Sequence, residues 1–410
     1  MKNGWQKKTL ADVCEIRPPK SEARERVAGD ALVSFAPMED LGIDRKLLNA
    51  TQVRPLASVV GSYTYFADGD VLLAKITPCF ENGKLGIAAG LSNGIGFGSS
   101  EFIVFRPGAS LDKEYLYYYL SRTDLRSEGA ARMGGAVGQQ RVPKEFIESY
   151  PIPVPPLPEQ QRIVGILDEA FAAIATAKAN AEKNLQNARA LFESHLQSVF
   201  TQRGGGWTET TLGEVCDLLN GFAFKSGDAV SESKTQLVRM GNLYRNKLNL
   251  DRDPVFYPDR FADDYERYLL YEGDLIMSLT GTTGKEDYGY AVRIPECGHN
   301  LLMNQRIAKF DAIRKDIANP NYLFYYLRSR TFLDILYPTA NGTRQANLSS
   351  VTIKSLPIPL CSVPEQTKLA AALDQMAAYA QHLGSIYERK LAALDELEKS
   401  LLHQAFTGNL

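Results

Sequence analysis

Two stretches of this chain decide its fold, GWQKKTLADVCEI at residues 4–16 and GWTETTLGEVCDL at residues 206–218. The second stretch repeats the first at a spacing far longer than the 20 to 50 residues of solenoid repeats. Each copy is therefore long enough to bury a core of its own. The chain is therefore a duplicated domain. Three further matches follow in the same order: GDVL at 69–72 and GDLI at 273–276, EYLYYYLSR at 114–122 and NYLFYYLRSR at 321–330, and YPIPVPPLPEQQRIVGILD at 150–168 and LPIPLCSVPEQTKLAAALD at 356–374.

Composition places the chain among ordinary globular proteins. It has 410 residues, 44% of them hydrophobic and 23% charged, which suits two or more domains. It shows no transmembrane run and no N-terminal targeting pattern, so we expect a cytoplasmic protein. A net charge of −2 neither supports nor excludes DNA as a partner.

Cysteine and histidine usage argues against a metal site. The five cysteines are odd in number and lack C-x-x-C spacing, which disfavours both disulfides and zinc. Cys14 and Cys216 occupy matching positions, and we expect both to be buried as small apolar side chains. The four histidines are scattered without ligand spacing, so no metal or acid–base role is expected.

Each copy has the pattern of a mixed α and β domain. Apolar runs at 70–74 and 102–105 predict strands, and the aromatic stretches 114–122 and 321–330 predict core-facing helices. Asn319 and Pro320 predict the N-cap and first turn of the second of these helices. The proline-rich segments 151–158 and 357–364 predict a stiff exit segment at the end of each copy, because proline cannot continue a helix or a central strand.

Long helices follow both exits, at about 159–201 and 365–406. Apolar side chains recur seven residues apart in each, as in a coiled coil. Gly384 weakens the second helix by roughly 1 kcal/mol relative to alanine. We expect the two stripes to bury each other, through an interface of Leu167, Phe171, Ile174, Ala181, Leu185, Ala188 and Phe192 on the first helix and Leu373, Ala380, Tyr387, Leu394 and Leu401 on the second.

Connectivity predicts the direction of this pair. The first helix leaves copy one and enters copy two through the short segment 202–206, so the second helix can pack on the first only by running back. The pair should be antiparallel. At 1.5 Å per residue, about 40 residues span roughly 60 Å, or about 17 base pairs at 3.4 Å each.

This layout resembles the specificity subunit (HsdS) of Type I restriction-modification systems over essentially the whole chain. The resemblance is carried by the entry pattern at Trp5 and Trp207, the Gly-Asp strands, the sequence GTTGK at 281–285, and the P-I-P and P-E-Q segments at the entry to each helix. It implies an α+β fold with an internal pseudo-twofold repeat: target-recognition domains at 1–155 and 207–360, with conserved spacer helices at 156–206 and 361–410 forming an antiparallel coiled coil.

The resemblance also implies a function without chemistry of its own. Each recognition domain of such a subunit reads one half of an interrupted site in double-stranded DNA, and the helices set the unread spacer. The partners are two modification subunits, which carry S-adenosylmethionine and methylate adenine, and restriction subunits, which use ATP. No cofactor is expected on this chain.

Reading bases needs paired donors and acceptors, chiefly Arg, Lys, Asn and Gln, and glycine-containing loops suit the approach to DNA. Each candidate could instead lie on an ordinary solvated loop. The candidates are Lys75, Thr77, Lys84, Gln139, Gln140 and Arg141 in copy one, and Thr280, Thr282, Thr283, Lys285, Arg344, Gln345 and Asn347 in copy two.

The alternatives are an adenine methyltransferase, a P-loop protein that binds ATP, and a scaffold that does not bind DNA. In an adenine methyltransferase, residues 319–322 would be an N-P-P-Y-like motif and glycines 94–98 a cofactor loop, but copy one lacks the Asn-Pro and the glycine run leads into a strand. A P-loop fails because position 279 is Leu279. A DNA-free scaffold would show no salt-dependent binding to DNA.

Overall fold

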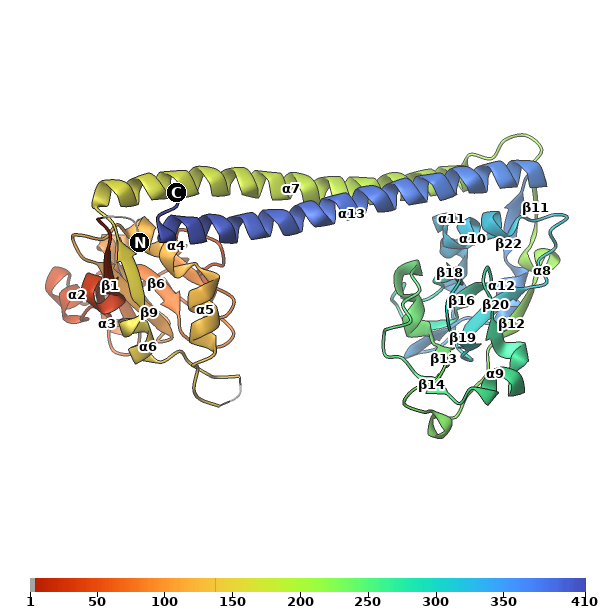
Figure 1. Ribbon diagram of the computed structural model, residues 1–410, viewed down its shortest axis with the longest axis horizontal. Helices are drawn as coiled ribbons and strands as arrows, with labels where there is room; N and C mark the ends of the chain where they lie inside the picture. The colour runs from red at the N-terminus through yellow and green to blue at the C-terminus, as the bar shows by residue number, and fades with distance from the viewer. Residues whose placement is uncertain (1–3, 137) are drawn as a thin grey trace. The chain divides into compact units, whose positions relative to one another are not determined.

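The computed structural model describes residues 4–136 and 138–410 (Figure 1). Contacts between Cα atoms divide the chain into two compact units, Met1–Glu182 with Glu388–Leu410 (unit 1) and Lys183–Tyr387 (unit 2). The divisions fall inside the two long helices, α7 (Leu157–Thr201) and α13 (Val363–Thr407), so each helix contributes a segment to both units.

Unit 1 is built on three sheets. The core helix α4 (Lys113–Leu120) packs on the first of them, and α5 (Thr123–Ala130) follows it directly. Neighbouring strands are antiparallel except β3 and β8. In sheet order the strands are β2 (Cys14–Ile16), β9 (Phe102–Pro107), β6 (Val71–Ala74) and β7 (Leu85–Ile87); then β4 (Gln52–Pro55), β3 (Leu32–Ala36), β8 (Ile95–Gly98) and β5 (Thr64–Ala67); then β1 (Gln6–Thr9) and β10 (Pro151–Val154).

Unit 2 repeats all three sheets in the same order, with the equivalent parallel pair β13 and β19. The helix α10 (Pro320–Arg328) takes the place of α4, and α11 (Arg330–Leu336) that of α5. The predicted α+β duplication is thus confirmed strand by strand. The strands are β12 (Asp217–Asn220), β20 (Ile307–Asp311), β16 (Leu275–Ser278) and β18 (Ala291–Arg293); then β14 (Phe256–Tyr257), β13 (Thr235–Val238), β19 (Asn300–Met303) and β15 (Leu269–Leu270); then β11 (Thr208–Thr211) and β22 (Pro357–Leu360).

Short elements complete both copies. One further strand pair belongs to unit 2, β17 (Thr280–Thr282) with β21 (Gln345–Asn347). The short helices are α1 (Leu10–Val13), α2 (Ser21–Arg26), α3 (Leu56–Val59), α6 (Lys144–Ser149), α8 (Leu212–Val215), α9 (Arg260–Asp264) and α12 (Ser350–Ser355), with 3₁₀ turns η1 (Met38–Asp40), η2 (Ser92–Gly94), η3 (Ser226–Asp228), η4 (Met240–Asn246), η5 (Glu266–Tyr268) and η6 (Tyr337–Thr339).

The proline-rich exits are strands rather than plain linkers. Pro151–Val154 pairs antiparallel with the entry strand Gln6–Thr9, and Pro357–Leu360 pairs with Thr208–Thr211. Proline is tolerated because each sheet has only two strands. One edge of each strand has no neighbouring strand, so a missing N–H donor on that edge breaks no hydrogen bond. The hydroxyls of Tyr322 and Tyr326 on α10 each donate to a proline carbonyl of β22 at 2.6 Å. These aromatics are core residues, as predicted.

The buried cysteines also match the prediction. Cys14 is 7% exposed and Cys216 is 4% exposed, and burial raises the pKa of each thiol to about 12. Neither is a reactive thiolate at neutral pH.

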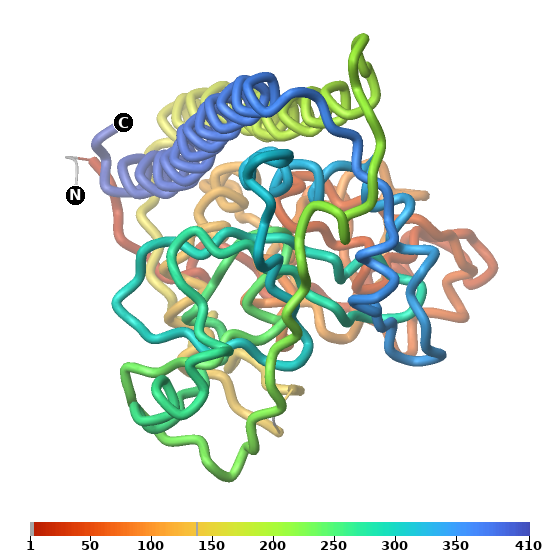
Figure 2. The backbone as a smooth tube through the Cα atoms, turned by 90° about the vertical axis from the view of Figure 1, so that its right-hand side faces the viewer, coloured from red at the N-terminus to blue at the C-terminus, as the bar shows by residue number. Residues whose placement is uncertain are grey.

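Within each unit, α7 and α13 run side by side in opposite directions, as both views show (Figures 1 and 2). In unit 1, the ammonium of Lys178 lies 2.6 Å from Asp395 and 2.9 Å from Glu398. In unit 2, a methyl carbon of Leu185 lies 3.6 Å from where a Cβ on Gly384 would sit. Both helices begin two residues before the predicted start. Within the described residues, none of the helices could cross a membrane.

The predicted interface residues divide into two groups. Leu167, Ile174, Ala181, Ala188, Phe192 and Leu373 are buried, whereas Phe171, Leu185, Ala380, Tyr387, Leu394 and Leu401 are partly exposed. Some of them face a domain as well as the other helix. Leu167 belongs to the core cluster of unit 1, and Phe192 and Leu373 belong to that of unit 2. The heptad stripe of α7 therefore includes residues that pack on the core of unit 1 and residues that pack on the core of unit 2.

Candidate nucleic-acid interface

In unit 2, the structure brings together the two loops that the sequence singles out. Strand β17, from the GTTGK segment, pairs antiparallel with β21, so that Thr280 lies opposite Asn347 and Thr282 opposite Gln345. The pairing continues where the backbone N–H of Leu348 donates to the carbonyl of Leu279 at 2.8 Å. Candidates far apart in sequence therefore share one small ladder.

Unit 1 has the same ladder in shorter form. Ile76 forms a bridge with Arg141, and the backbone N–H of Val142 donates to the carbonyl of Lys75 at 2.9 Å. Arg141 also pairs with Gly134, as Asn347 pairs with Asn341. Arg141 and Asn347 hence occupy equivalent positions in the two copies.

The candidates of unit 1 differ in how available their side chains are. Lys75 donates to the carbonyl of Ser100 at 2.8 Å, and burial lowers its pKa, while Lys84 donates to the carbonyl of Met38 at 2.8 Å. The hydroxyl of Thr77 is half-buried against the carbonyl of Gln140. Both lysines thus hold backbone in place. Gln139 and Arg141 are exposed.

Arg141 is held by an ion pair. Its Nε and Nη2 donate to the two oxygens of Glu101 at 2.9 and 2.8 Å, a bidentate arrangement. The hydrogen bond from Arg141 lowers the pKa of Glu101 despite partial burial of the carboxyl. The guanidinium group of Arg141 is therefore held in one orientation and is already hydrogen-bonded to Glu101.

The candidates of unit 2 form a turn and an exposed rim. Thr282 donates from its N–H and hydroxyl to Asp287 at 2.6 and 2.7 Å, and Thr283 donates to the carbonyl of Gly342 at 3.1 Å. Burial raises the pKa of Asp287, but the hydrogen bonds from Thr282 outweigh it and lower the pKa overall. Thr280 is buried at 7% exposure. Lys285, Arg344 and Asn347 are exposed, and Gln345 is half-buried.

Beside Thr280, the structure forms a cavity that sequence reasoning missed. Its lining includes Arg239, Arg252 and Arg306. They come from three separate segments that share no motif, so only the fold brings them together.

The repeated Gly-Asp pair is a structural turn. Gly69 and Gly273 have φ of +92° and +86°, which favours glycine. Asp70 accepts from the N–H of Ala67 at 2.8 Å, and Asp274 accepts from the N–H of Tyr271 at 2.9 Å. The aspartate therefore closes the turn before each central strand.

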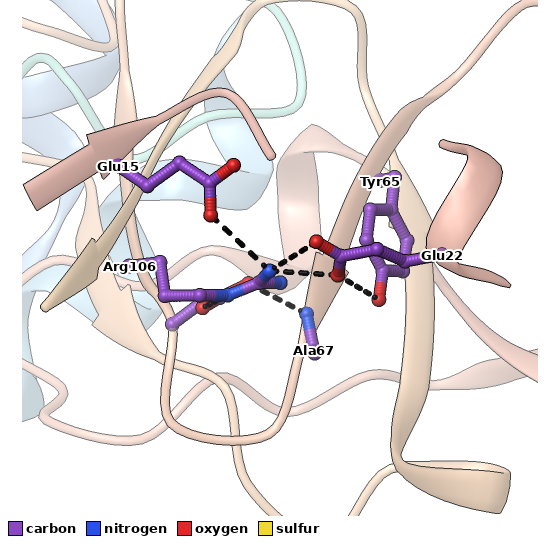
Figure 3. Close-up of polar contacts among 6 residues, drawn as sticks. Glu15, Glu22, Tyr65, Ala67 and Arg106 are labelled. Atoms are coloured by element: carbon purple, nitrogen blue, oxygen red, sulfur yellow. Dashed lines mark hydrogen bonds and ion pairs between the residues drawn. The ribbon is translucent and has the colours of Figure 1, made fainter. Parts of the chain in front are cut away.

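In unit 1 this turn joins a charge network (Figure 3). Arg106 donates to Asp70 at 2.9 Å and to Glu22 at 2.7 Å, and Tyr65 donates to Glu22 at 3.2 Å. Burial raises the pKa of Asp70, and Arg106 opposes that shift. The network ties α2 to β9 and to the turn before β6.

The residues suggestive of a methyltransferase have structural roles. The side chain of Asn319 caps α10 by accepting from the N–H groups of Asn321 and Tyr322 at 2.8 and 3.2 Å. Gly96 and Gly98 lie within strand β8, where no helix follows to bind a phosphate. Among the described residues, no cluster of three His, Cys, Asp or Glu side chains could hold a metal.

Comparison with known proteins agrees with this architecture. The family model for the Type I restriction modification DNA specificity domain matches residues 2–186 and again residues 204–383. The chain belongs to this family, and it contains the domain twice.

Several relatives of this chain are specificity subunits of Type I restriction enzymes. The Type I restriction enzyme EcoAI specificity subunit of Escherichia coli is 26% identical, over 91% of this chain and 77% of its own length. The MjaVIII specificity subunit of Methanocaldococcus jannaschii is 25% identical, over 73% and 71%. The HsdS subunit from Thermoanaerobacter tengcongensis has the same fold, with a TM-score of 0.65, 18% identity, and coverage of 100% of this chain and 98% of that one. A chain from a structure of the type I R-M system reaches a TM-score of 0.79 at 18% identity, over 100% and 99%.

Proposed function

We propose that this chain is the DNA-recognition subunit of a Type I restriction-modification complex and reads an interrupted site through two domains, residues 1–155 and 207–360. One observation carries the proposal: the two copies share three sheets in the same order, yet their paired loops carry different residues at equivalent positions. Arg141 in one copy corresponds to Asn347 in the other. Side chains with different donors and acceptors at equivalent positions favour different bases, so the two half-sites should differ.

The antiparallel helices supply the spacer in this proposal. Each comprises 45 residues, so a straight helix of that length spans about 68 Å, equal to about 20 base pairs. Support comes from the opposed packing of α7 and α13 in each unit.

The catalytic steps belong to partners in this account. A duplicated subunit offers two similar faces, which matches two copies of one modification subunit. Those subunits would bind S-adenosylmethionine and methylate adenine, and restriction subunits would use ATP. The chain itself would direct these activities without catalysing them.

A domain exchange tests the proposal. Residues 207–360 are replaced by the second domain of another family member, and methylated adenines are mapped in cells that express the chimera with its modification subunit. One half-site should change while the other half and the spacer persist. The reciprocal exchange of residues 1–155 is the control and should change the opposite half. A change in both halves from either exchange would refute the proposal that each domain reads its own half-site.

A further inference from the structure

A polar cavity of about 390 Å³ in unit 2 gathers positive charge. Arg239, Arg252 and Arg306 line it, together with one acidic residue, Asp253. Within residues 4–136 and 138–410, none of the three guanidinium groups forms an ion pair; Arg239 donates to the backbone carbonyl of Asp253, and Arg252 donates to that of Gly241 at 3.5 Å. Three cations therefore face one cavity with a single carboxylate to offset them.

The cavity is held in shape by a buried amide. Asn242, only 2% exposed, accepts from the N–H of Arg239 at 2.8 Å and donates to the carbonyl of Arg252 at 2.9 Å. Arg252 also lies over the ring of Tyr244, 5.5 Å from its centroid. The backbones that carry two of the arginines are thus fixed before any ligand binds, which limits the entropy lost on binding.

The third arginine distinguishes unit 2 from unit 1. Arg306 ends a turn in which its backbone N–H donates to Asn304 Oδ1 at 3.2 Å. In unit 1, Glu101 ends the equivalent turn, and its backbone N–H donates to Ser99 Oγ at 3.2 Å. The carbonyl of each also accepts from the residue after the central strand, Leu279 or Lys75, at 2.9 Å. Glu101 is an acid, already paired with Arg141 and 3.8 Å from Lys75. The equivalent point of unit 1 thus carries the opposite charge.

The cavity adjoins the candidate DNA loops. The hydroxyl of Thr280, in β17, lies 2.9 Å from the sulfur of Met240, which also lines the cavity. A duplex placed against the β17–β21 ladder would therefore bring its backbone beside the three arginines.

We propose that this cavity binds a backbone phosphate of DNA next to the half-site that residues 207–360 read, and that unit 1 has no equivalent contact. Planar guanidinium groups match a phosphate with two parallel hydrogen bonds, and several cations around one concave site suit a compact anion better than a flat base edge. The inference rests on the proposed function, because it takes DNA as the ligand.

The test compares Arg306→Gln and Arg252→Gln with wild type in the complete complex with its modification subunits. Affinity for a duplex carrying the mapped site, and for one without it, is measured from low to high salt. Arg314→Gln is the matched control, since Arg314 is exposed beyond the opposite end of β20 and donates to the carbonyl of Glu214. Methylation mapping of each variant shows whether the sequence read has changed.

Each cavity variant should bind both duplexes about tenfold more weakly. The slope of log affinity against log salt should fall by about 0.9, as for one lost phosphate contact. The methylated sequence should stay the same, and Arg314→Gln should match wild type. Unchanged affinity and slope, or an altered methylated sequence, would overturn the inference while leaving the proposed function intact. A wild-type complex without site-specific methylation would overturn both.

Discussion

Tyr325 on α10 donates a hydrogen bond of 2.6 Å to Asp374 on α13, which joins the second domain to its long helix. Arg293 reaches the same carboxylate oxygen at 2.9 Å. Unit 1 repeats the arrangement, with Tyr118 donating to Asp168 on α7 and Lys46 contacting the same oxygen at 2.7 Å. A tyrosine and a cation thus anchor each helix to its domain.

Removal of the Tyr325 hydroxyl should loosen this junction. We expect Tyr325→Phe to lower the free energy of unfolding by about 1 kcal/mol, because one hydrogen bond to a half-buried carboxylate is lost. Urea titration followed by circular dichroism measures the change. Tyr379→Phe is the control, because Tyr379 lies on α13, as Asp374 does, and is 64% exposed. Equal midpoints for Tyr325→Phe and wild type would contradict the anchoring role.

The glutamine of the P-E-Q segment at the start of each long helix should be a stability determinant. Gln366 is fully buried; it accepts from the N–H of Asn319 at 2.8 Å and donates to the carbonyls of Ile317 and Cys361 at 2.9 and 2.8 Å. Gln366→Ala leaves these backbone groups unpaired and should cost about 3 kcal/mol. Thermal unfolding checks this, with exposed Gln381→Ala on the same helix as control. A loss below about 0.5 kcal/mol would show that the motif has another purpose.

The pair between Glu101 and Arg141 should make stability depend on pH. Since the pKa of Glu101 is lowered in the folded protein, the pair stabilises above the ordinary glutamate pKa of about 4.3, and this contribution disappears as pH falls through the folded value. Arg141→Gln should therefore be less stable than wild type at pH 7 and equally stable near pH 3. Unfolding at several pH values measures the difference, with Arg24→Gln as an exposed control. A difference independent of pH would contradict this origin.

Helix length should set the spacer. Insertion of one heptad after Glu182 in α7 and another after Tyr387 in α13 keeps the apolar stripe in register and adds about 10.5 Å, or about three base pairs. Both half-sites should persist with a longer gap between them, as read by methylation mapping. Insertion into α7 alone is the control and should reduce stability, because the stripes no longer match. An unchanged gap in the double insertion would show that the helices do not measure distance.

Much of the fold is visible in the sequence because the repeat supplies an internal comparison. The change from Asp112 to Asn319 at the helix N-cap shows that Asn-Pro is a capping feature, and the structure agrees. Heptad spacing locates both long helices to within two residues. The strands of the proline-rich exits were missed, since their pairing with residues 6–9 and 208–211 depends on distant segments.

The candidate interface was only partly visible. The pairing of Thr280 with Asn347 unites two loops that glycine and polar residues had marked. Arg239, Arg252 and Arg306 carried no local signal, because their significance lies in convergence on one cavity. Lys84 has the right residue type, but its ammonium group is used by the carbonyl of Met38.

The most direct test of the central claim is long-read mapping of methylated adenines in cells that express this chain with its modification subunit. The account predicts one asymmetric motif with two different specific halves separated by a fixed number of unread base pairs. A single uninterrupted motif, or no methylation despite a confirmed complex, would contradict it.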